Sequence, residues 1–518
     1  MKRINYIIST YLILFLLVSC NALDLSPEDY YGSSNFWNNS SQVKGYMIGL
    51  HGRLREKAES LFILGEARGG TLKSGTSFLN NSLDYSSPIK TNTFSKYLTG
   101  INNWNGLYEN ILEVNLFIQK VENECDFLTS EERNQGLAQA YGLRAFYYFM
   151  LYRTYGGVPL VKLPNVMNGV THAENLYLER SSAKETFDFI KGDIQKSEEL
   201  FGTNGQIGKG RTLWSKPATL MLKAEIYLWS AKVSTEDQIA APDDATIAKK
   251  ALEPLIGQFR LLPDFKDVFD YENKGNDEII FAIGFADGEK SNFAENFTYY
   301  VQHFNNQFYG QNGQLMADTL ETKGNGLLRN EYKWGLFASM DDDDTRKRST
   351  FLDCYYQDGA QAGLILRKFM GMLNSNGNRS YCDDYIIYRY ADVLLMMAEI
   401  ENLQGGNVAG YINQVRQRAY GASFKPAVHV YENSTFEQNE LAILKERDKE
   451  FVWEGKRWFD LVRMCDGTKK SLVFSSKANY DDPSPVLNEQ KSFMILWPID
   501  IETLNNDPKL VNNPGYEN

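Results

Sequence analysis

The sequence predicts a mainly α-helical protein in which pairs of helices stack into one superhelical scaffold, with an irregular, loop-rich excursion that carries short strands. Three observations support this prediction. Apolar residues recur at helical spacing through most of the first and last thirds of the chain. The helical segments come in pairs that each need a neighbour to bury an apolar face. Between about residues 257 and 380 this pattern gives way to short apolar runs set among Asn, Gly and aromatic residues.

The first clear pair of helices spans about residues 104–155. Apolar residues from Leu107 to Val121 recur at three- and four-residue steps, which indicates one amphipathic helix. A second helix is expected to open at Ser130, because acidic residues fill its first turn. The glycine pair that begins at Gly156 is expected to end it.

Further helical segments follow in the same arrangement. They are 181–200 with 215–233, 385–403 with 407–419, and a last long helix over 436–464. Pro217 suits the first turn of a helix, where its missing N–H is not needed. Gly405 separates the two helices of the later pair. Together these segments predict one continuous scaffold.

Two segments, 70–103 and 257–380, lack the helical pattern. Within the second, the apolar runs 278–283 and 363–369 have the length of strands. Long irregular segments in a compact protein are usually functional or disordered. Aromatic residues make up 13% of the chain, which argues against disorder. We therefore expect both segments to fold onto the scaffold and to form the binding face.

The first 20 residues predict export and lipid attachment. Two basic residues precede an apolar stretch of 13 residues, 6–18, which is shorter than the roughly 20 residues of a membrane-spanning helix. Cys20 follows in a Leu-x-Ser-Cys arrangement typical of a lipobox. Residues 1–19 are therefore expected to be a signal peptide, and Cys20 the lipidated first residue of a single mature domain, 20–518.

Composition excludes several classes of function. The net charge of −12 becomes −14 once the two basic residues of the signal peptide are removed, so nucleic acid is not an expected partner. The four histidines form no H-x-x-H or H-E-x-x-H pattern, so neither a histidine-built metal site nor a catalytic triad is supported. No cofactor is expected. The cysteine spacing neither requires nor excludes a disulfide between Cys354 and Cys382.

Several segments of this chain resemble hallmark segments of the SusD/RagB family of nutrient-binding outer-membrane lipoproteins. In chain order they are 24–27 behind the lipobox, 144–160, 388–399, 412–419, 446–463, 497–502 and 513–516. The resemblance is strong over 104–230 and 383–518 and weak over 60–103 and 285–380. Asp500 departs from the family, which often has a proline there, and this affects only the shape of that turn.

The resemblance implies a SusD-like fold with tetratricopeptide-like helices at about 40–70, 104–256 and 383–518, and variable ligand-face loops at about 70–103 and 257–380. It also implies a partner, a SusC-like TonB-dependent transporter in the outer membrane. On that transporter the lipid-anchored protein would face the outside of the cell and act as a lid that captures ligand. Because the resemblance is weak over the loops, the identity of the ligand is not carried over.

Candidate ligand-binding residues are the aromatic and amide side chains of the two irregular segments. They are Asn81, Tyr85, Tyr97, Tyr300, Phe308, Tyr309, Tyr332 and Trp334. A flat aromatic ring suits the C–H face of a sugar ring, and amides both donate to and accept from hydroxyl groups. This mixture predicts glycan binding without a cofactor or a bound metal.

Two other functions stay open at this point. The main alternative is that the same scaffold binds peptide, as in RagB-like proteins. A glycoside hydrolase that uses paired carboxylates is the second, but among 66 acidic residues no motif singles out a pair. We therefore expect a binding protein and not an enzyme.

Charged side chains near the C-terminus have a structural explanation. Arg447, Glu450, Glu454, Arg457, Asp460 and Arg463 follow one another at helical spacing. Such spacing predicts ion pairs along the last helix rather than a ligand site. The acidic run 341–344 lacks the order of a calcium-binding loop, so we expect it to be salt-bridged to Arg346, Lys347 or Arg348.

Overall fold

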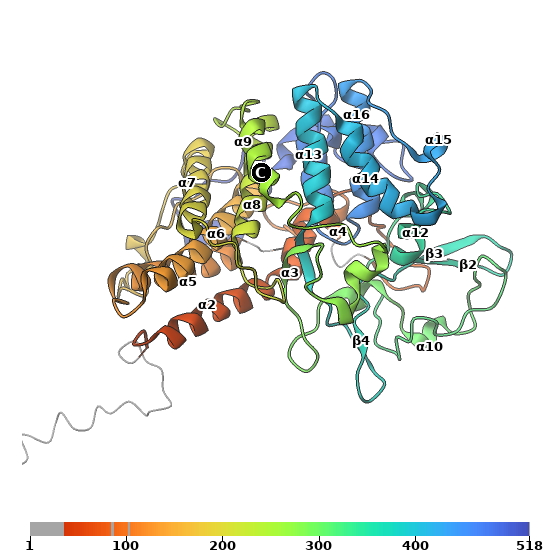
Figure 1. The fold of residues 1–518 in the computed structure, drawn as a ribbon, viewed down its shortest axis with the longest axis horizontal. Coiled ribbons are helices and arrows are strands. Elements are labelled where there is room, and N and C mark those ends of the chain that lie inside the picture. The colour runs from red at the N-terminus through yellow and green to blue at the C-terminus, as the bar shows by residue number, and fades with distance from the viewer. Residues whose placement is uncertain (1–35, 84–86, 102–103, 517–518) are drawn as a thin grey trace, which may run out of the picture.

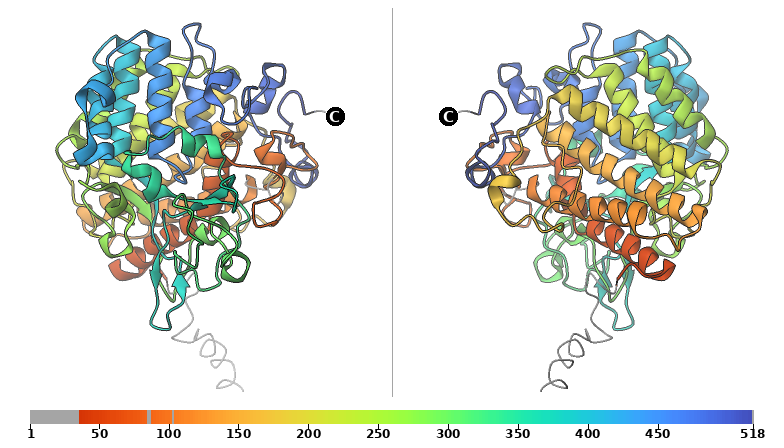
Figure 2. Two further views of the ribbon diagram at one scale, coloured as in Figure 1. Left: turned by 90° about the vertical axis from the view of Figure 1, so that its right-hand side faces the viewer. Right: turned by 90° about the vertical axis from the view of Figure 1, so that its left-hand side faces the viewer.

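In the computed structural model, which describes residues 36–83, 87–101 and 104–516, the longer helices pack against one another in chain order. The N-terminal group is α2 (Ser40–Arg55), α5 (Trp104–Asn123), α6 (Ser130–Tyr155), α7 (Ala183–Phe201), α8 (Lys216–Lys232) and α9 (Asp244–Leu252). The C-terminal group is α13 (Tyr390–Gln404), α14 (Val408–Tyr420), α16 (Phe436–Glu450) and α17 (Arg457–Arg463). The two groups meet where α9 packs against α13 (Figure 1, Figure 2). This confirms the predicted mainly α-helical scaffold.

Shorter helices lie in the connections and in the excursion. They are α3 (Ala58–Phe62), which continues into a π-helical turn at Ile63–Ala67, α4 (Ser87–Lys90), α10 (Val301–Phe304), α11 (Trp334–Ala338), α12 (Thr345–Thr350), α15 (Pro426–His429) and α18 (Ile501–Asn506). Within the described ranges, no helix combines the length and the apolar character needed to cross a membrane.

Side chains at the helix ends explain where the scaffold helices begin. Helix α6 opens at Ser130, as predicted, and the Thr129 side chain and Glu132 cap it reciprocally. Helix α8 is capped by Ser215 and carries a proline in its first turn. Gly156 ends α6 with a φ of +78°, a left-handed conformation that glycine adopts without strain.

The predicted last helix over 436–464 is wrong, because the chain forms two helices there, α16 and α17. Trp453 and Gly455 both have a φ of +67° in the turn between them. A Cβ at Gly455 would lie 2.4 Å from Tyr385 Oη, and one at Gly65 would lie 1.8 Å from Gly455 O. The turn therefore lets two backbone segments approach more closely than a continuous helix with side chains would allow.

A second correction concerns the expected helix over 385–403. Its first residues form strand β6 (Tyr385–Arg389), and helix α13 begins only at Tyr390. Strand β6 pairs antiparallel with β1 (Ile279–Ile283), which lies in the predicted apolar run 278–283. The other antiparallel pairs in the described residues are β2 (Phe351–Tyr355) with β3 (Gln361–Leu366), and β4 (Met372–Leu373) with β5 (Arg379–Ser380).

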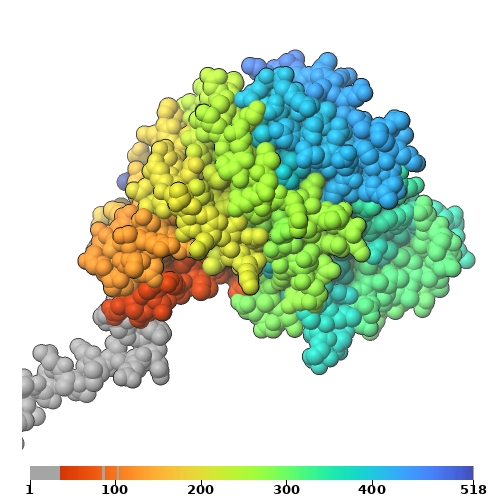
Figure 3. All heavy atoms as spheres, in the orientation of Figure 1, coloured from red at the N-terminus to blue at the C-terminus, as the bar shows by residue number. Residues whose placement is uncertain are grey.

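The excursion has a small core of its own. One large hydrophobic cluster runs through the scaffold from Trp37 to Tyr516. A second cluster lies among the loops and contains Phe78, Leu79, Tyr299, Phe304, Phe308, Met316, Leu320, Leu328, Cys354 and Ile365. Tyr299 and Phe304 stack in it with ring centroids 3.8 Å apart. In Figure 3 the excursion forms a lobe beside the helical layer, at the lower right.

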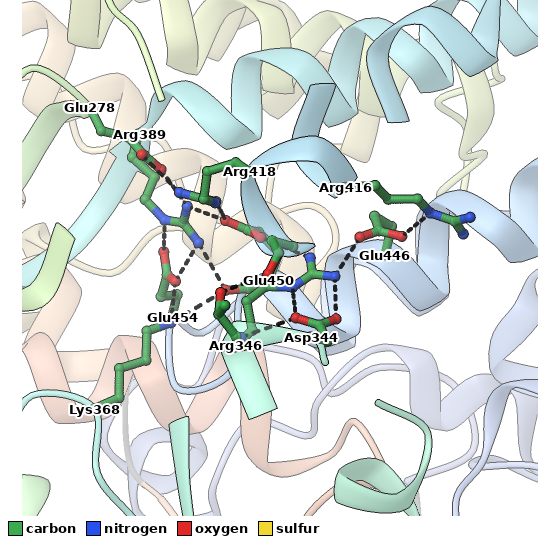
Figure 4. Close-up of polar contacts among 12 residues, drawn as sticks. Glu278, Asp344, Arg346, Lys368, Arg389, Arg416, Arg418, Glu446, Glu450 and Glu454 are labelled. Carbon is green, nitrogen blue, oxygen red and sulfur yellow. Dashed lines mark hydrogen bonds and ion pairs between the residues drawn. The ribbon is translucent and has the colours of Figure 1, made fainter. Parts of the chain in front are cut away.

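A buried network of charges fastens the excursion to the scaffold (Figure 4). The excursion contributes Glu278, Asp344, Arg346 and Lys368, and the scaffold contributes Arg389, Arg418, Glu446, Glu450 and Glu454. Arg346 Nη1 lies 2.9 Å from Glu450 Oε2, Arg389 Nη1 lies 2.7 Å from Glu278 Oε1, and Lys368 Nζ lies 2.6 Å from Glu454 Oε1. Buried charges of this kind need partners on all sides.

The predicted ion pairs near the C-terminus are present, but most connect different elements. Arg447 bonds to Asp392 on α13 and to Asp460 on α17, each at 2.7 Å. Arg463 pairs with Asp460 three residues earlier and also reaches Glu399. Helical spacing identified the residues and missed the partners, because the segment bends between α16 and α17.

The acidic run 341–344 is salt-bridged as predicted. Asp344 pairs with Arg346 at 2.7 Å, and Asp342 pairs with Lys347 at 2.8 Å. In the described part of the chain, no group of three or more His, Cys, Asp or Glu side chains is placed to hold a metal ion.

Candidate functional site

Three aromatic side chains of the excursion come together at its surface, and we call Tyr309, Trp334 and Tyr355 the aromatic face. Tyr309 and Tyr355 exchange backbone hydrogen bonds of 2.8 and 2.9 Å across an antiparallel bridge. Residues paired in this way point their side chains to the same side of the bridge. The Trp334 and Tyr355 ring centroids are 5.5 Å apart at 77°. All three side chains are partly exposed.

Backbone alternation separates Phe308 from Tyr309, and the start of helix α11 at Trp334 separates Trp334 from Tyr332. Phe308 precedes Tyr309, points to the opposite side and lies in the small core, 5% exposed. Tyr332 precedes Trp334 by two residues and is 2% exposed, with its hydroxyl donating to Glu66 Oε1 at 3.2 Å. Phe308 and Tyr332 therefore pack the excursion and are not part of the aromatic face.

The remaining candidates lie elsewhere or cannot be placed. Tyr97 is 68% exposed and stands beside Lys96, whose backbone bonds to Ile501. Asn81 donates its amide to Leu327 O at 3.1 Å, and Tyr300 contacts the loop at Gly324. Tyr85 and the predicted lipidation site Cys20 lie outside the described residues. The structure thus brings together two of the eight predicted side chains.

Polar groups border the aromatic face on one side. The Tyr355 hydroxyl donates to Asp353 Oδ2 at 3.0 Å, and the other oxygen of Asp353 accepts from Arg348 Nη1. Arg348 Nη2 donates to Gln311 Oε1 at 2.6 Å. Burial and the bond to Asp353 raise the pKa of Tyr355 to about 12, so its hydroxyl stays protonated at neutral pH. Aromatic rings beside amide and charged groups suit stacking on a sugar and hydrogen bonding to its hydroxyls.

Sequence reasoning missed Tyr355 and Arg348. Tyr355 ends a strand whose alternate residues Phe351 and Asp353 share its side, and this period-2 pattern was the available signal. Its pairing with Tyr309 is a contact between distant parts of the chain, which no local pattern reveals. The sequence predicts Arg348 as a possible partner of the acidic run, whereas in the structure it bonds to Asp353.

A cavity of about 450 Å³ adjoins the aromatic face through Arg348, which contributes to both. Its wall includes Tyr271, Phe369 and Arg367, and Asp383 lies against it. Asp383 Oδ2 accepts from the backbone N–H of Gly371, whereas Oδ1 has no hydrogen-bond partner in the described residues. The wall of the cavity is therefore largely charged, with Lys266, Arg367 and Asp270 among its residues, and it also carries one unpaired carboxylate oxygen.

Asp383 is expected to make stability depend on pH. Burial raises its pKa to about 7, although the Gly371 N–H opposes the rise, whereas an unfolded aspartate has a pKa of about 3.9. The folded state therefore binds the proton more tightly, and its free energy of unfolding falls as pH rises from about 4 to about 7. Asp383→Asn is expected to remove this fall, which amounts to at most about 4 kcal/mol.

Urea unfolding of the wild type and the variant at several pH values measures this effect. Asp287→Asn is a matched control, since Asp287 lies on an exposed turn. Equal slopes against pH for wild type and Asp383→Asn would show that Asp383 ionises normally in the folded protein.

The described cysteines do not form disulfides. Cys125, Cys354, Cys382 and Cys465 are all buried free thiols. The open question of a bridge between Cys354 and Cys382 is therefore answered in the negative. Cys354 packs in the small core beneath the aromatic face, where it acts as an apolar side chain.

Stacked helix pairs that carry a loop-rich excursion with short strands define a mainly α-helical protein of the SusD-like fold. Residues 277–516 match the SusD family, and residues 23–228 match a family described as starch-binding and associating with the outer membrane. A solved SusD superfamily protein from Bacteroides fragilis is 40% identical, with 93% of this chain and 100% of that chain covered and a TM-score of 0.88. This chain belongs to the SusD family.

Two further comparisons agree. NanU from Bacteroides fragilis is 33% identical, with 95% of this chain and 100% of that chain covered and a TM-score of 0.82. The starch-binding protein SusD from Bacteroides thetaiotaomicron is 23% identical over 100% of both chains. Similarity therefore extends over nearly the whole length of this chain.

Proposed function

We propose that this protein binds glycan at the aromatic face and does not break it. The observation that carries the proposal is the grouping of Tyr309, Trp334 and Tyr355 beside the Arg348, Asp353 and Gln311 side chains. Rings of this kind cover the apolar face of a sugar, and the bordering groups hydrogen-bond to its hydroxyls. Two comparisons support a glycan ligand, because the family matched by residues 23–228 is described as starch-binding and the relative from Bacteroides thetaiotaomicron is named a starch-binding protein.

The cellular setting is part of the same proposal. Cys20 carries the lipid that anchors the mature chain in the outer membrane, on the extracellular side. There the protein delivers its ligand to a SusC-like TonB-dependent transporter and covers the pore as a lid. The description of the matched family as associating with the outer membrane supports this setting. Identification of such a transporter by mass spectrometry, after purification of the full-length chain from solubilised outer membranes, tests the partnership.

A binding screen of the soluble form that starts after Cys20 tests the ligand class. The protein is screened against a glycan array and a pool of casein peptides, and the same samples are analysed for products. We expect glycan binding without new reducing ends. Binding of peptides alone would replace the proposal by peptide uptake on the same scaffold, and a cleaved glycan would show that the protein is an enzyme.

A further inference from the structure

Six asparagines of this chain are followed directly by glycine, and all six pairs lie in the described residues. They are Asn105–Gly106, Asn168–Gly169, Asn204–Gly205, Asn312–Gly313, Asn325–Gly326 and Asn376–Gly377. Asparagine is chemically labile in such pairs, because glycine has no side chain to keep its backbone nitrogen away from the preceding amide. The attack needs a free glycine N–H and an asparagine side chain folded towards it. The structure therefore decides which pair reacts.

Asn204 meets both requirements. Its Oδ1 accepts from the backbone N–H of Gln206 at 3.0 Å, which forms an Asx turn. The ring that this bond closes contains Cγ of Asn204 and the backbone nitrogen of Gly205, so the side chain is folded back over the peptide that follows it. The same bond stabilises negative charge on Oδ1, which favours attack on Cγ. The Gly205 N–H itself has no hydrogen-bond partner among the described residues.

The loop around Asn204 leaves room for the reaction. Residues 204–208 form neither helix nor strand between α7 and α8, and Gly205 and Gln206 are exposed. A Cβ added at Gly205 or Gly208 would meet nothing within 4 Å beyond its own chain neighbours. The backbone can therefore rearrange into a cyclic intermediate without displacing a packed neighbour.

Hydrogen bonds protect three of the other pairs. The N–H groups of Gly169, Gly313 and Gly377 donate to carbonyl oxygens three residues earlier, at 3.2, 2.9 and 2.8 Å. Each of these nitrogens must give up its bond before it can attack, which raises the barrier. These three pairs are therefore expected to react more slowly than Asn204.

The last two pairs are protected by their surroundings. Asn105 belongs to helix α5, where side chains tilt towards the N-terminus and so away from the following nitrogen. Asn325 donates its amide to Arg379 O at 2.8 Å, which holds the side chain in place. A Cβ at Gly326 would lie 2.1 Å from Tyr299 O, so the backbone there is closely packed.

We propose that Asn204 is a site of spontaneous deamidation, with water as the co-reactant. The Gly205 nitrogen loses its proton to solvent and bonds to Cγ of Asn204, while the bond from Cγ to Nδ2 breaks and the amide nitrogen leaves as ammonia. Water then opens the resulting succinimide at either carbonyl, which gives aspartate or isoaspartate. The product carries one more negative charge, and isoaspartate also lengthens the main chain. The proposal is independent of the function of the aromatic face.

Peptide mapping of the soluble form that starts after Cys20 tests the proposal. The protein is incubated at neutral and at mildly alkaline pH in water enriched in a heavy oxygen isotope, and is then digested with trypsin in ordinary water. The tryptic peptide 197–209 contains no asparagine other than Asn204. We expect label to enter it at least about ten times faster than it enters Asn312 or Asn376, because those sites must first break a hydrogen bond. Alkaline pH is expected to speed the reaction, since the attacking nitrogen must lose its proton.

Gly205→Ala is expected to slow the reaction at Asn204 at least about tenfold, because the added methyl group hinders the attacking nitrogen. Gly208→Ala in the same loop is the matched control and is expected to react as the wild type does. Neither glycine has a left-handed φ and neither position is crowded, so both variants are expected to fold, which circular dichroism checks.

Three results would each overturn the proposal. The first is a peptide 197–209 that gains no label. The second is label that enters Asn204 no faster than it enters Asn312 or Asn376. The third is a Gly205→Ala variant that reacts as fast as Gly208→Ala, since the Gly205 nitrogen would then not be the attacking group.

Discussion

Glu450→Ala is expected to lower the free energy of unfolding by about 3–5 kcal/mol, because it removes the centre of a buried charge network. Glu450 Oε1 lies 2.6 Å from Arg389 and also accepts from Arg418, and Oε2 lies 2.9 Å from Arg346. Burial would raise the pKa of Glu450, but these three guanidinium groups outweigh it and hold the pKa below its usual range. The variant leaves three buried cations with one carboxylate fewer.

Glu450→Gln separates the charge from the volume of the side chain. It fills the same space and removes the charge, so most of the loss is expected to persist if the network is electrostatic. Urea unfolding with far-UV circular dichroism measures both variants. Limited proteolysis is expected to cut first in the excursion, since Glu278, Arg346 and Lys368 attach it to the scaffold.

Glu437→Ala on the same helix is the control. Glu437 pairs with Lys477 at 3.0 Å, and both side chains are largely exposed. Exposed pairs of this kind contribute at most about 1 kcal/mol. If Glu437→Ala and Glu450→Ala destabilise the protein equally, the buried network does not hold the excursion in place.

Local patterns in the sequence were sufficient for the scaffold, because a helix that buries one face shows its period within a few turns. The break between α16 and α17 was missed for a related reason. Phe451 and Val452 continue the apolar pattern without interruption, while Trp453 adopts a left-handed φ that this residue type does not signal. Only the close approach of Gly65 and Gly455 explains the turn, and it is a tertiary contact.

The candidate site was less predictable than the scaffold. Composition pointed to the aromatic residues of the excursion, but it did not separate those that pack from those that are exposed. Phe308 and Tyr309 are adjacent aromatic residues, but Phe308 is buried and Tyr309 is partly exposed. Successive side chains of an extended chain point to opposite sides, which explains the difference. The missing information was the pairing of Tyr309 with Tyr355, which joins two loops far apart in the sequence.

The double variant Tyr309→Ala, Trp334→Ala is expected to weaken binding of the glycan found in the screen by at least about 100-fold, or about 2.7 kcal/mol. Both rings are partly exposed, and together with Tyr355 they provide the flat apolar surface that the proposed stacking requires. The helical melting transition is expected to stay nearly unchanged, since both side chains are partly exposed and Trp334 only borders the large hydrophobic cluster. Isothermal titration calorimetry and thermal circular dichroism measure the two effects.

Tyr97→Ala is the matched control, because Tyr97 is the most exposed of the predicted aromatics that the structure describes and lies away from the aromatic face. It is expected to bind as the wild type does.

Tyr355→Phe keeps the ring and loses the hydroxyl that bonds to Asp353, so it tests whether the polar border or the ring area matters more. If the double variant also loses the melting transition, Tyr309 and Trp334 are packing residues. If it melts normally and still binds with unchanged affinity, the glycan is held elsewhere, because the variant has lost two of the three rings of the aromatic face.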